Sequence, residues 1–128
     1  MSELRHWSLW LRLENLVVLL TAAVVYHHGE YNWWLFAVVF LVPDLSILGY
    51  LAGRGVGATV YNLAHAYIGP AALLAFALIS GDQRLTPFAI IWVAHIAADR
   101  LLGFGLKSVS GFRHTHLGFV GKEPSVQE

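Results

Sequence analysis

The sequence predicts an all-α integral membrane protein, an up-down four-helix bundle with its N and C termini in the cytoplasm. Hydrophobic residues make up 57% of the 128 residues, charged residues make up only 12%, and four long apolar stretches alternate with short polar segments. A soluble domain usually carries about 25% charged residues. Half that fraction of charged residues cannot cover the surface of a small soluble domain, so lipid must cover the rest.

The four apolar stretches each approach the roughly 20 residues that a helix needs to cross a bilayer. The segments between them are short and contain turn-forming glycines, so neighbouring helices must run antiparallel. The first stretch follows a polar start and precedes other long apolar stretches, which favours a retained helix over a cleaved signal peptide. The expected helices cover residues 11–26, 32–52, 57–80 and 86–106 of a transmembrane domain at 1–107, and residues 108–128 form a cytoplasmic tail.

The basic residues predict the orientation. With four spans, the N-terminus, the middle loop and the tail lie on one side, and Arg84 is the only basic residue expected on the other. Cytoplasmic segments of membrane proteins carry an excess of Lys and Arg, so the richer side is expected to be cytoplasmic. Its basic residues are Arg5, Arg12, Arg54, Arg100, Lys107, Arg113 and Lys122.

Ionisable residues inside the expected spans predict a polar site. Such groups are costly in a bilayer and by default mark function. At about 1.5 Å of rise per residue, Asp44 and His65 each lie roughly 12 Å in from the middle loop. His95 and Asp99 are four residues apart, share one face of the fourth helix, and lie at a similar depth. The antiparallel topology therefore predicts that these four side chains meet in the inner leaflet.

Two imidazoles and two carboxylates suit a divalent metal such as zinc, manganese or iron, and a metal with an open position can activate water. This favours a metal-dependent hydrolase that acts on a lipid-like or amphipathic substrate. The expected metal ligands and catalytic groups are Asp44, His65, His95 and Asp99, with His116 of the tail as a further catalytic residue. The expected substrate-binding residues are Arg100, Arg113, Asn62 and Glu14.

Two other functions stay open. A small proton-coupled transporter could work as a homodimer, with Glu14, Asp44 and Asp99 titrating. A non-enzymatic membrane module would use its polar residues only to lock helices together. A haem or quinone cofactor also stays open, because His65 and His95 could be axial ligands. The zero net charge argues against a nucleic-acid partner, and the absence of Cys excludes disulfides and thiolate metal sites.

Four segments also carry a family resemblance: PDLSILGYLAG at 43–53, YNLAH at 61–65, WVAHI with DRLLGFGLK within 92–107, and GF with THLG within 111–118. Over residues 11 to 121 the chain resembles an uncharacterised family of small bacterial four-helix membrane proteins, a domain of unknown function. The resemblance implies this architecture and a bacterial inner-membrane location, and it implies no activity. A weaker resemblance to membrane-bound metal-dependent hydrolases rests on Arg113, Thr115 and His116, but the residue before Arg113 is Phe112 where that pattern has His.

Overall fold

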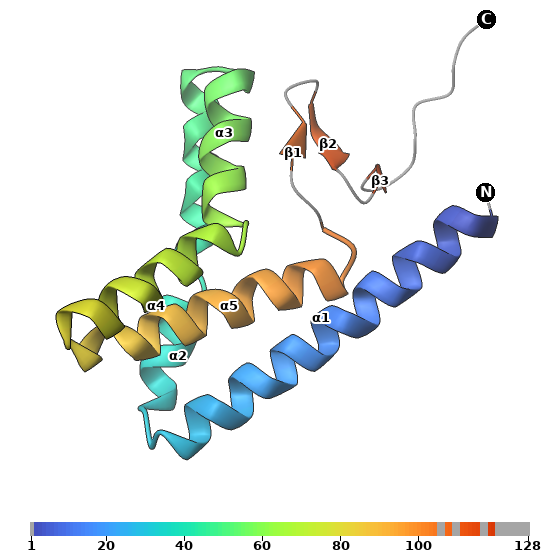
Figure 1. Cartoon of the computed structure of the whole chain (residues 1–128). Coiled ribbons are helices and arrows are strands. Elements are labelled where there is room, and N and C mark those ends of the chain that lie inside the picture. The colour runs from blue at the N-terminus through green and yellow to red at the C-terminus, as the bar shows by residue number, and fades with distance from the viewer. Residues whose placement is uncertain (1, 105–106, 109–110, 116–117, 120–128) are drawn as a thin grey trace, which may run out of the picture.

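The described part of the chain is helical up to Leu101 and is followed by short strands (Figure 1). The computed structural model describes residues 2–104, 107–108, 111–115 and 118–119. The helices are α1 (Ser2–His28), α2 (Trp33–Val39), the 3-10 helix η1 (Val42–Ala52), α3 (Arg54–Ala64), α4 (Ile68–Ser80), the 3-10 helix η2 (Gln83–Leu85) and α5 (Thr86–Leu101). The strands are β1 (Lys107–Ser108), β2 (Gly111–Thr115) and β3 (Gly118–Phe119).

The all-α membrane domain is confirmed, but it contains five α-helices where four were expected. Two expected helices, 32–52 and 57–80, are each broken in the middle. Within the described residues, Arg5–His28 and Trp33–Ala52 are long and apolar enough to cross a membrane, and Arg54–Ala64 with Ile68–Ser80 adds a third span if this pair, bent by 48°, crosses as one. The expected fourth span is α5, whose 16 residues extend about 24 Å at 1.5 Å per residue, short of a hydrocarbon core of about 30 Å.

The first break follows from Pro43. Proline has no backbone N–H and cannot continue the hydrogen-bond pattern of an α-helix. The backbone N–H of Phe40 still donates to the carbonyl of Phe36, four residues back, whereas the N–H of Asp44 donates to that of Leu41, only three back. The chain therefore tightens into the 11-residue η1, far longer than the few residues usual for a 3-10 helix, and such stretches often mark functional hinges.

Helix α5 is the centre of the helical domain. It lies between α1, which runs antiparallel to it, and α4 (Figure 1), and it contacts both. The alanines of α5 permit this close packing, and the helix supplies half of the buried hydrophobic core: Ala89, Ile91, Ala94, Ile96 and Ala97. Its position between two other helices explains how a helix of 16 residues can sit within a membrane protein.

A hairpin of η1 and α3 projects from the other helices (Figure 1). Its two arms touch at Gly49 and Gly57. A Cβ added at Gly57 would lie 2.3 Å from the Tyr50 ring, and one added at Gly49 would lie 3.1 Å from Val60. Gly53, between the two arms, has open space around it and a φ of +117°, so it makes the turn rather than the contact.

We expect Gly57→Val to separate the hairpin arms and to lower the free energy of unfolding by about 1–3 kcal/mol, the usual cost of overpacking. Gly55→Val is the matched control, because a Cβ at Gly55 meets nothing within 4 Å. Unfolding of both variants in mixed detergent micelles measures the difference. Equal stability of the two would contradict the close approach of η1 and α3.

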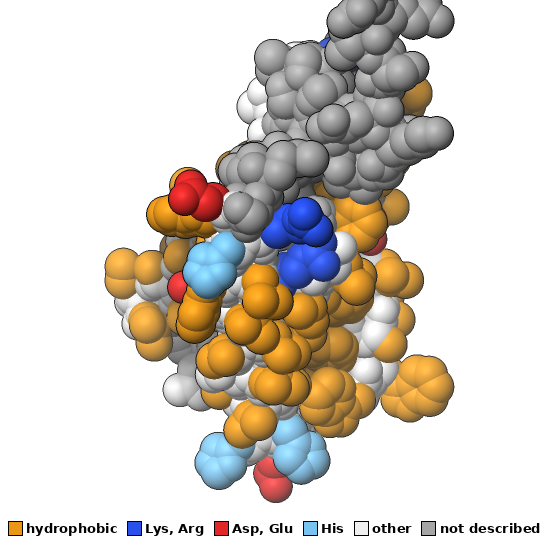
Figure 2. Space-filling view, turned by 90° about the vertical axis from the view of Figure 1, so that its right-hand side faces the viewer, with side chains coloured by type: hydrophobic (Ala, Val, Ile, Leu, Met, Phe, Trp, Pro, Cys, Tyr) orange, Lys and Arg blue, Asp and Glu red, His pale blue; other side chains and the backbone are white. Residues whose placement is uncertain are grey.

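The surface of the helical domain is that of a membrane protein. Figure 2 shows one face covered mostly by hydrophobic side chains, with basic side chains and a histidine toward one end and further histidines at the opposite end. Many large hydrophobic residues are exposed, among them Trp34 at 82%, Leu51 at 88% and Ile79 at 86%. Exposed apolar area on this scale is typical of contact with lipid.

The tail contains structure that the sequence did not predict as strands. Strands β1, β2 and β3 form an antiparallel sheet in that order, and β1 and β2 contact α3. The sheet thus lies on the side of the molecule that holds the tip of the hairpin (Figure 1).

Candidate metal centre

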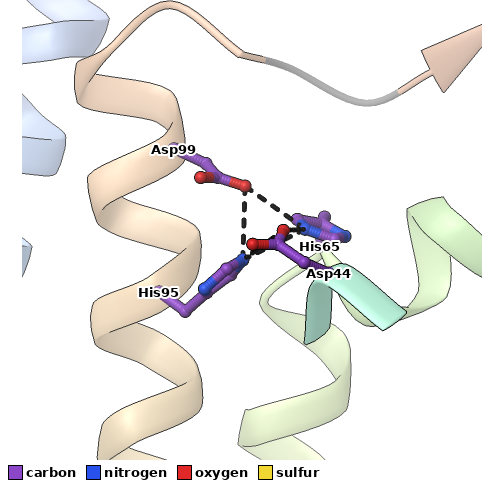
Figure 3. Close-up of side chains that lie close together, drawn as sticks. All are labelled: Asp44, His65, His95 and Asp99. Carbon is purple, nitrogen blue, oxygen red and sulfur yellow. Dashed lines mark hydrogen bonds and ion pairs between the residues drawn. The ribbon is translucent and has the colours of Figure 1, made fainter. Parts of the chain in front are cut away.

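The four residues predicted to form a site do come together (Figure 3). Asp44 lies in the first turn of η1, His65 directly follows α3, and His95 and Asp99 lie one turn apart on α5. Each broken segment therefore contributes one residue at or next to its break, and the continuous helix contributes two. The cluster sits where all three chain segments meet.

The four side chains meet through one atom each. The Nε2 atom of His65 lies 3.4 Å from Asp44 Oδ1 and 3.2 Å from Asp99 Oδ2. The Nε2 atom of His95 lies 3.2 Å from Asp44 Oδ1 and 3.3 Å from Asp99 Oδ2. The two Nε2 atoms are themselves 3.2 Å apart, so five short distances join four potential ligand atoms.

Protons alone cannot satisfy these five contacts. Ionised carboxylates only accept hydrogen bonds, and each Nε2 atom carries at most one proton. The Nδ1 atom of His65 lies 2.9 Å from the carbonyl oxygen of Tyr61, so Nδ1 donates there and the Nε2 atom of a neutral His65 ring presents a lone pair to the cluster. Four electron-rich atoms would then face one another with too few protons between them, and a cation at their centre would satisfy all four.

The spacing matches a small tetrahedral ion. A zinc ion with bonds of about 2.0 Å to nitrogen and oxygen places its ligand atoms about 3.3 Å apart. The five distances fall between 3.2 and 3.4 Å, and the four ligand atoms all lie within 4.8 Å of one another. Two nitrogen and two oxygen atoms placed in this way could hold a divalent metal ion.

Among the described residues of the cluster, Asp44 is the most exposed to the surroundings. The side chains of His65 and His95 are 4% and 2% exposed, and that of Asp99 is 23% exposed. The side chain of Asp44 is 48% exposed, so access to the centre lies along this carboxylate. The accessible ligand is also the one carried by the 3-10 helix.

The two imidazoles are held differently. The ring of His65 stacks on that of Tyr61, with centroids 3.8 Å apart and planes 8° apart, in addition to the contact of Nδ1 with the Tyr61 carbonyl. The ring of His95 packs edge-on against Phe40 at 5.0 Å, and its Nδ1 atom is buried with no hydrogen-bond partner among the described residues. Since a ring nitrogen that is fixed by a partner sets the orientation of a metal-ligating histidine, His65 is the better oriented of the two.

Side chains of α5 hold the second break in place. The indole Nε1 atom of Trp92 donates to the carbonyl of Ala64 at 2.6 Å, and Nη2 of Arg100 donates to the carbonyl of His65 at 3.4 Å. The Trp92 ring also covers Gly69, where an added Cβ would lie 2.5 Å from it. Irregular backbone at membrane depth is tolerated only where its polar groups find partners within the protein or in water. These contacts supply such partners beside His65.

A polar chain links the centre to α1. The guanidinium of Arg100 lies 4.7 Å above the ring of Tyr67, and the Tyr67 hydroxyl donates to Oδ1 of Asn15. Asn15 is buried, whereas its neighbour Glu14 is exposed. The sequence singled out Glu14, but the structure turns Asn15 inward instead; a polar residue in the first apolar stretch was the available signal.

We expect Tyr67→Phe to lower the free energy of unfolding by about 0.6–1.7 kcal/mol, the range for hydrogen bonds between membrane helices. Unfolding of Tyr67→Phe, Asn15→Leu and the double variant measures the coupling. Fully additive effects of the two substitutions would show that the Tyr67 hydroxyl does not depend on Asn15.

The remaining predicted residues either lie outside the cluster or are not among the described parts of the structure. Asn62 is half-buried on α3, and its carbonyl accepts a hydrogen bond from the backbone N–H of His65 at 3.2 Å. Arg113 lies in β2, but its side chain is not described, and His116 falls outside the described residues. The structure therefore places the four metal-ligand candidates and Arg100 together and leaves these two tail residues as expectations.

Fold and site together define a helical membrane protein with an Asp/His group capable of holding a metal ion. Residues 8–120 match the family described as a domain of unknown function, DUF4260, and the chain belongs to that family. This confirms the family resemblance seen in the sequence, over nearly the same residues. No curated protein and no solved structure matches the chain.

Proposed function

We propose that the chain binds one divalent metal ion, zinc by its geometry, through Asp44, His65, His95 and Asp99, and uses it to hydrolyse an amphipathic substrate at the membrane surface. The observation that supports this most is the set of five distances of 3.2–3.4 Å among four ligand atoms that cannot all share protons. A zinc ion bound there would lower the pKa of a coordinated water and so supply hydroxide at neutral pH.

The exposure of Asp44 supports catalysis. A catalytic zinc ion usually keeps three protein ligands and one open position. Asp44 is the accessible ligand, and it is carried by η1 rather than by a regular helix. We propose that Asp44 would act as the general base, which takes a proton from the attacking water and passes it to the leaving group. Arg100, whose Nε atom is buried without a partner among the described residues, would bind an anionic head group beside the centre, and Arg113 and His116 of the tail are further candidates.

A second candidate function is transport of the metal ion itself. Four protein ligands fill a tetrahedral zinc site, as in sites that hold a metal without chemistry. Discontinuous helices that meet at a binding site are also typical of secondary transporters, and here both broken segments meet at the cluster. For a transporter, Asp44 would be the ligand that releases the ion, and a homodimer would enclose the route of the ion across the membrane.

We propose that the chain resides in a bacterial inner membrane with the hairpin tip and tail in the cytoplasm. The chain contains no Cys, so single cysteines introduced at Gly53 and at Gly81, in the turns after η1 and α4, can be labelled without background. A membrane-impermeant thiol reagent added to intact cells should label the cysteine at 81 and leave the one at 53 unlabelled.

The hydrolase is tested with Asp44→Asn. We expect purified wild-type protein to hold about one zinc per chain and to cleave the p-nitrophenyl ester or phosphodiester of an eight-carbon chain. The variant should bind zinc more weakly but still be loaded at saturating zinc, because His65, His95 and Asp99 remain. Its turnover should fall by at least about 100-fold, the lower end of the usual contribution of a general base. Metal analysis and release of p-nitrophenol measure both quantities.

A zinc-loaded wild-type protein that releases no p-nitrophenol from either substrate would contradict the hydrolase. Zinc flux into liposomes by that same preparation, absent in Asp44→Asn, would then establish transport. Wild-type protein that takes up neither zinc nor manganese nor iron would overturn both functions.

A further inference from the structure

An apolar groove adjoins the candidate metal centre. Two of its lining residues, Pro43 and Ala64, directly precede Asp44 and His65, and Trp92 on its wall holds the carbonyl of Ala64. The groove has a volume of about 310 Å³. Its other lining residues are Val39, Val42, Ser46, Leu73 and Phe88.

We propose that this groove binds the single hydrocarbon chain of the substrate, with the polar head of the substrate at Asp44. The inference rests on the proposed function and names its substrate class: an amphiphile with one acyl or isoprenoid chain. The volume lies at the lower end of the 300–1,000 Å³ typical of ligand pockets, which suits one chain better than two. Because the groove adjoins the centre, a hydrocarbon chain bound in it would place the polar head of the substrate beside the metal ligands.

One polar atom in the groove also points to a ligand. The hydroxyl oxygen of Ser46 is buried and has no hydrogen-bond partner among the described residues. Buried hydroxyl groups in proteins nearly always have a partner. Ser46 lies two residues after Asp44, so an ester or hydroxyl oxygen between the head and the chain of an amphiphile would meet this group.

The rim of the groove faces the position of the lipid. Val42 is 50% exposed and Phe88 is 38% exposed, so a chain can enter sideways from the bilayer. A second apolar pocket, of about 420 Å³, lies between α1, α4 and α5, and none of the four metal-ligand candidates lines it. Ordinary bilayer lipid can fill either pocket, whereas an amphiphile whose head binds at Asp44 should favour the groove, because Pro43 and Ala64 of its lining directly precede two metal-ligand candidates.

The experiment uses dodecyl phosphate with a diazirine at the end of its chain and, as neutral probe, dodecanol with the same diazirine. Both are cross-linked to the zinc-loaded full chain in nanodiscs, and labelled residues are mapped by mass spectrometry. We expect the phosphate probe to label the groove at Leu73 and Phe88 at least tenfold more than the pocket lined by Leu74 and Ile90. The neutral probe should show no such preference.

Val42→Trp should fill the groove and lower its labelling at least tenfold. Val38→Trp is the matched control, because Val38 is 67% exposed and does not line the groove. Equal labelling of groove and second pocket, unchanged labelling in Val42→Trp, or cross-links between two copies of the chain would overturn the inference.

Metal content separates this inference from the proposed function. If the protein binds one zinc per chain but Val42→Trp does not change the labelling, the proposed chain-binding groove is contradicted and the metal centre is not. Groove labelling that responds to Val42→Trp in a protein that binds no metal supports the chain site and counts against the metal centre.

Discussion

Replacing His95 by alanine is expected to lower the affinity of the purified protein for zinc by more than about 100-fold. Loss of an outer-shell partner of a metal ligand already costs about 10–100-fold, and loss of a ligand itself should cost more. The Nε2 atom of His95 takes part in three of the five short contacts, to Asp44, Asp99 and His65. Its removal leaves three ligands, of which Asp44 is the exposed one. Competition with a chromophoric chelator measures the affinity.

His28→Ala is the control, because His28 is exposed at the end of α1 and lies outside the cluster. His95→Gln preserves most of the buried volume and separates loss of a ligand from loss of packing, since the His95 ring is fully buried. A His95→Gln variant that folds and binds zinc as tightly as the His28→Ala control would rule out His95 as a ligand and with it the tetrahedral centre.

The metal-ligand candidates were predictable from depth alone. In an antiparallel bundle, residues equally far from loops on one side lie at one level, so counting from the loops placed Asp44, His65, His95 and Asp99 together. Their spacing of four residues predicted that His95 and Asp99 share one face of the helix, and the contact between His95 Nε2 and Asp99 Oδ2 confirms this. The prediction needed no knowledge of the breaks, because both breaks lie close to the residues in question.

The breaks themselves were only half predictable. Pro43 signalled the first, since proline cannot continue the helical hydrogen bonds. The second break, between Ala64 and Ile68, has no proline or glycine within it. Pro70, which follows the break, is a local signal, because it has no N–H to donate to the carbonyl of Ala66, four residues back. The contacts of Trp92 and Arg100 with the carbonyls of Ala64 and His65 come from another helix and leave no local signal.

The burial of Asn15 could not be predicted from the sequence for a related reason. Which face of α1 is buried depends on how it packs against α5, and a helix in lipid is apolar on all sides, so its sequence does not mark the packed face. In the structure, the packed face of α1 is the one that carries Asn15, because the hydroxyl of Tyr67 donates a hydrogen bond to the Asn15 side chain. The polar residue that the bundle can satisfy internally is turned inward, and the carboxylate of Glu14 remains exposed.

Trp92→Ala is expected to lower the free energy of unfolding by about 3–5 kcal/mol, the cost of deleting a large aromatic side chain from a core. The indole fills the space above Gly69 and binds the carbonyl of Ala64 at 2.6 Å, so its loss opens a cavity and leaves a buried carbonyl without its partner. Unfolding in mixed detergent micelles measures the loss. Trp34→Ala is the matched control, because Trp34 is 82% exposed and should change stability little.

Trp92→Phe isolates the hydrogen bond. It keeps an aromatic ring near Gly69 but removes the N–H, so it should cost about 1–3 kcal/mol, the penalty for an unsatisfied buried polar group. Because Ala64 directly precedes His65, the same variant should also weaken zinc binding, although Trp92 is not among the metal-ligand candidates. A Trp92→Phe variant with full stability and full zinc affinity would show that the break between α3 and α4 does not need the hydrogen bond from Trp92. It would also show that α5 positions the centre only through His95 and Asp99.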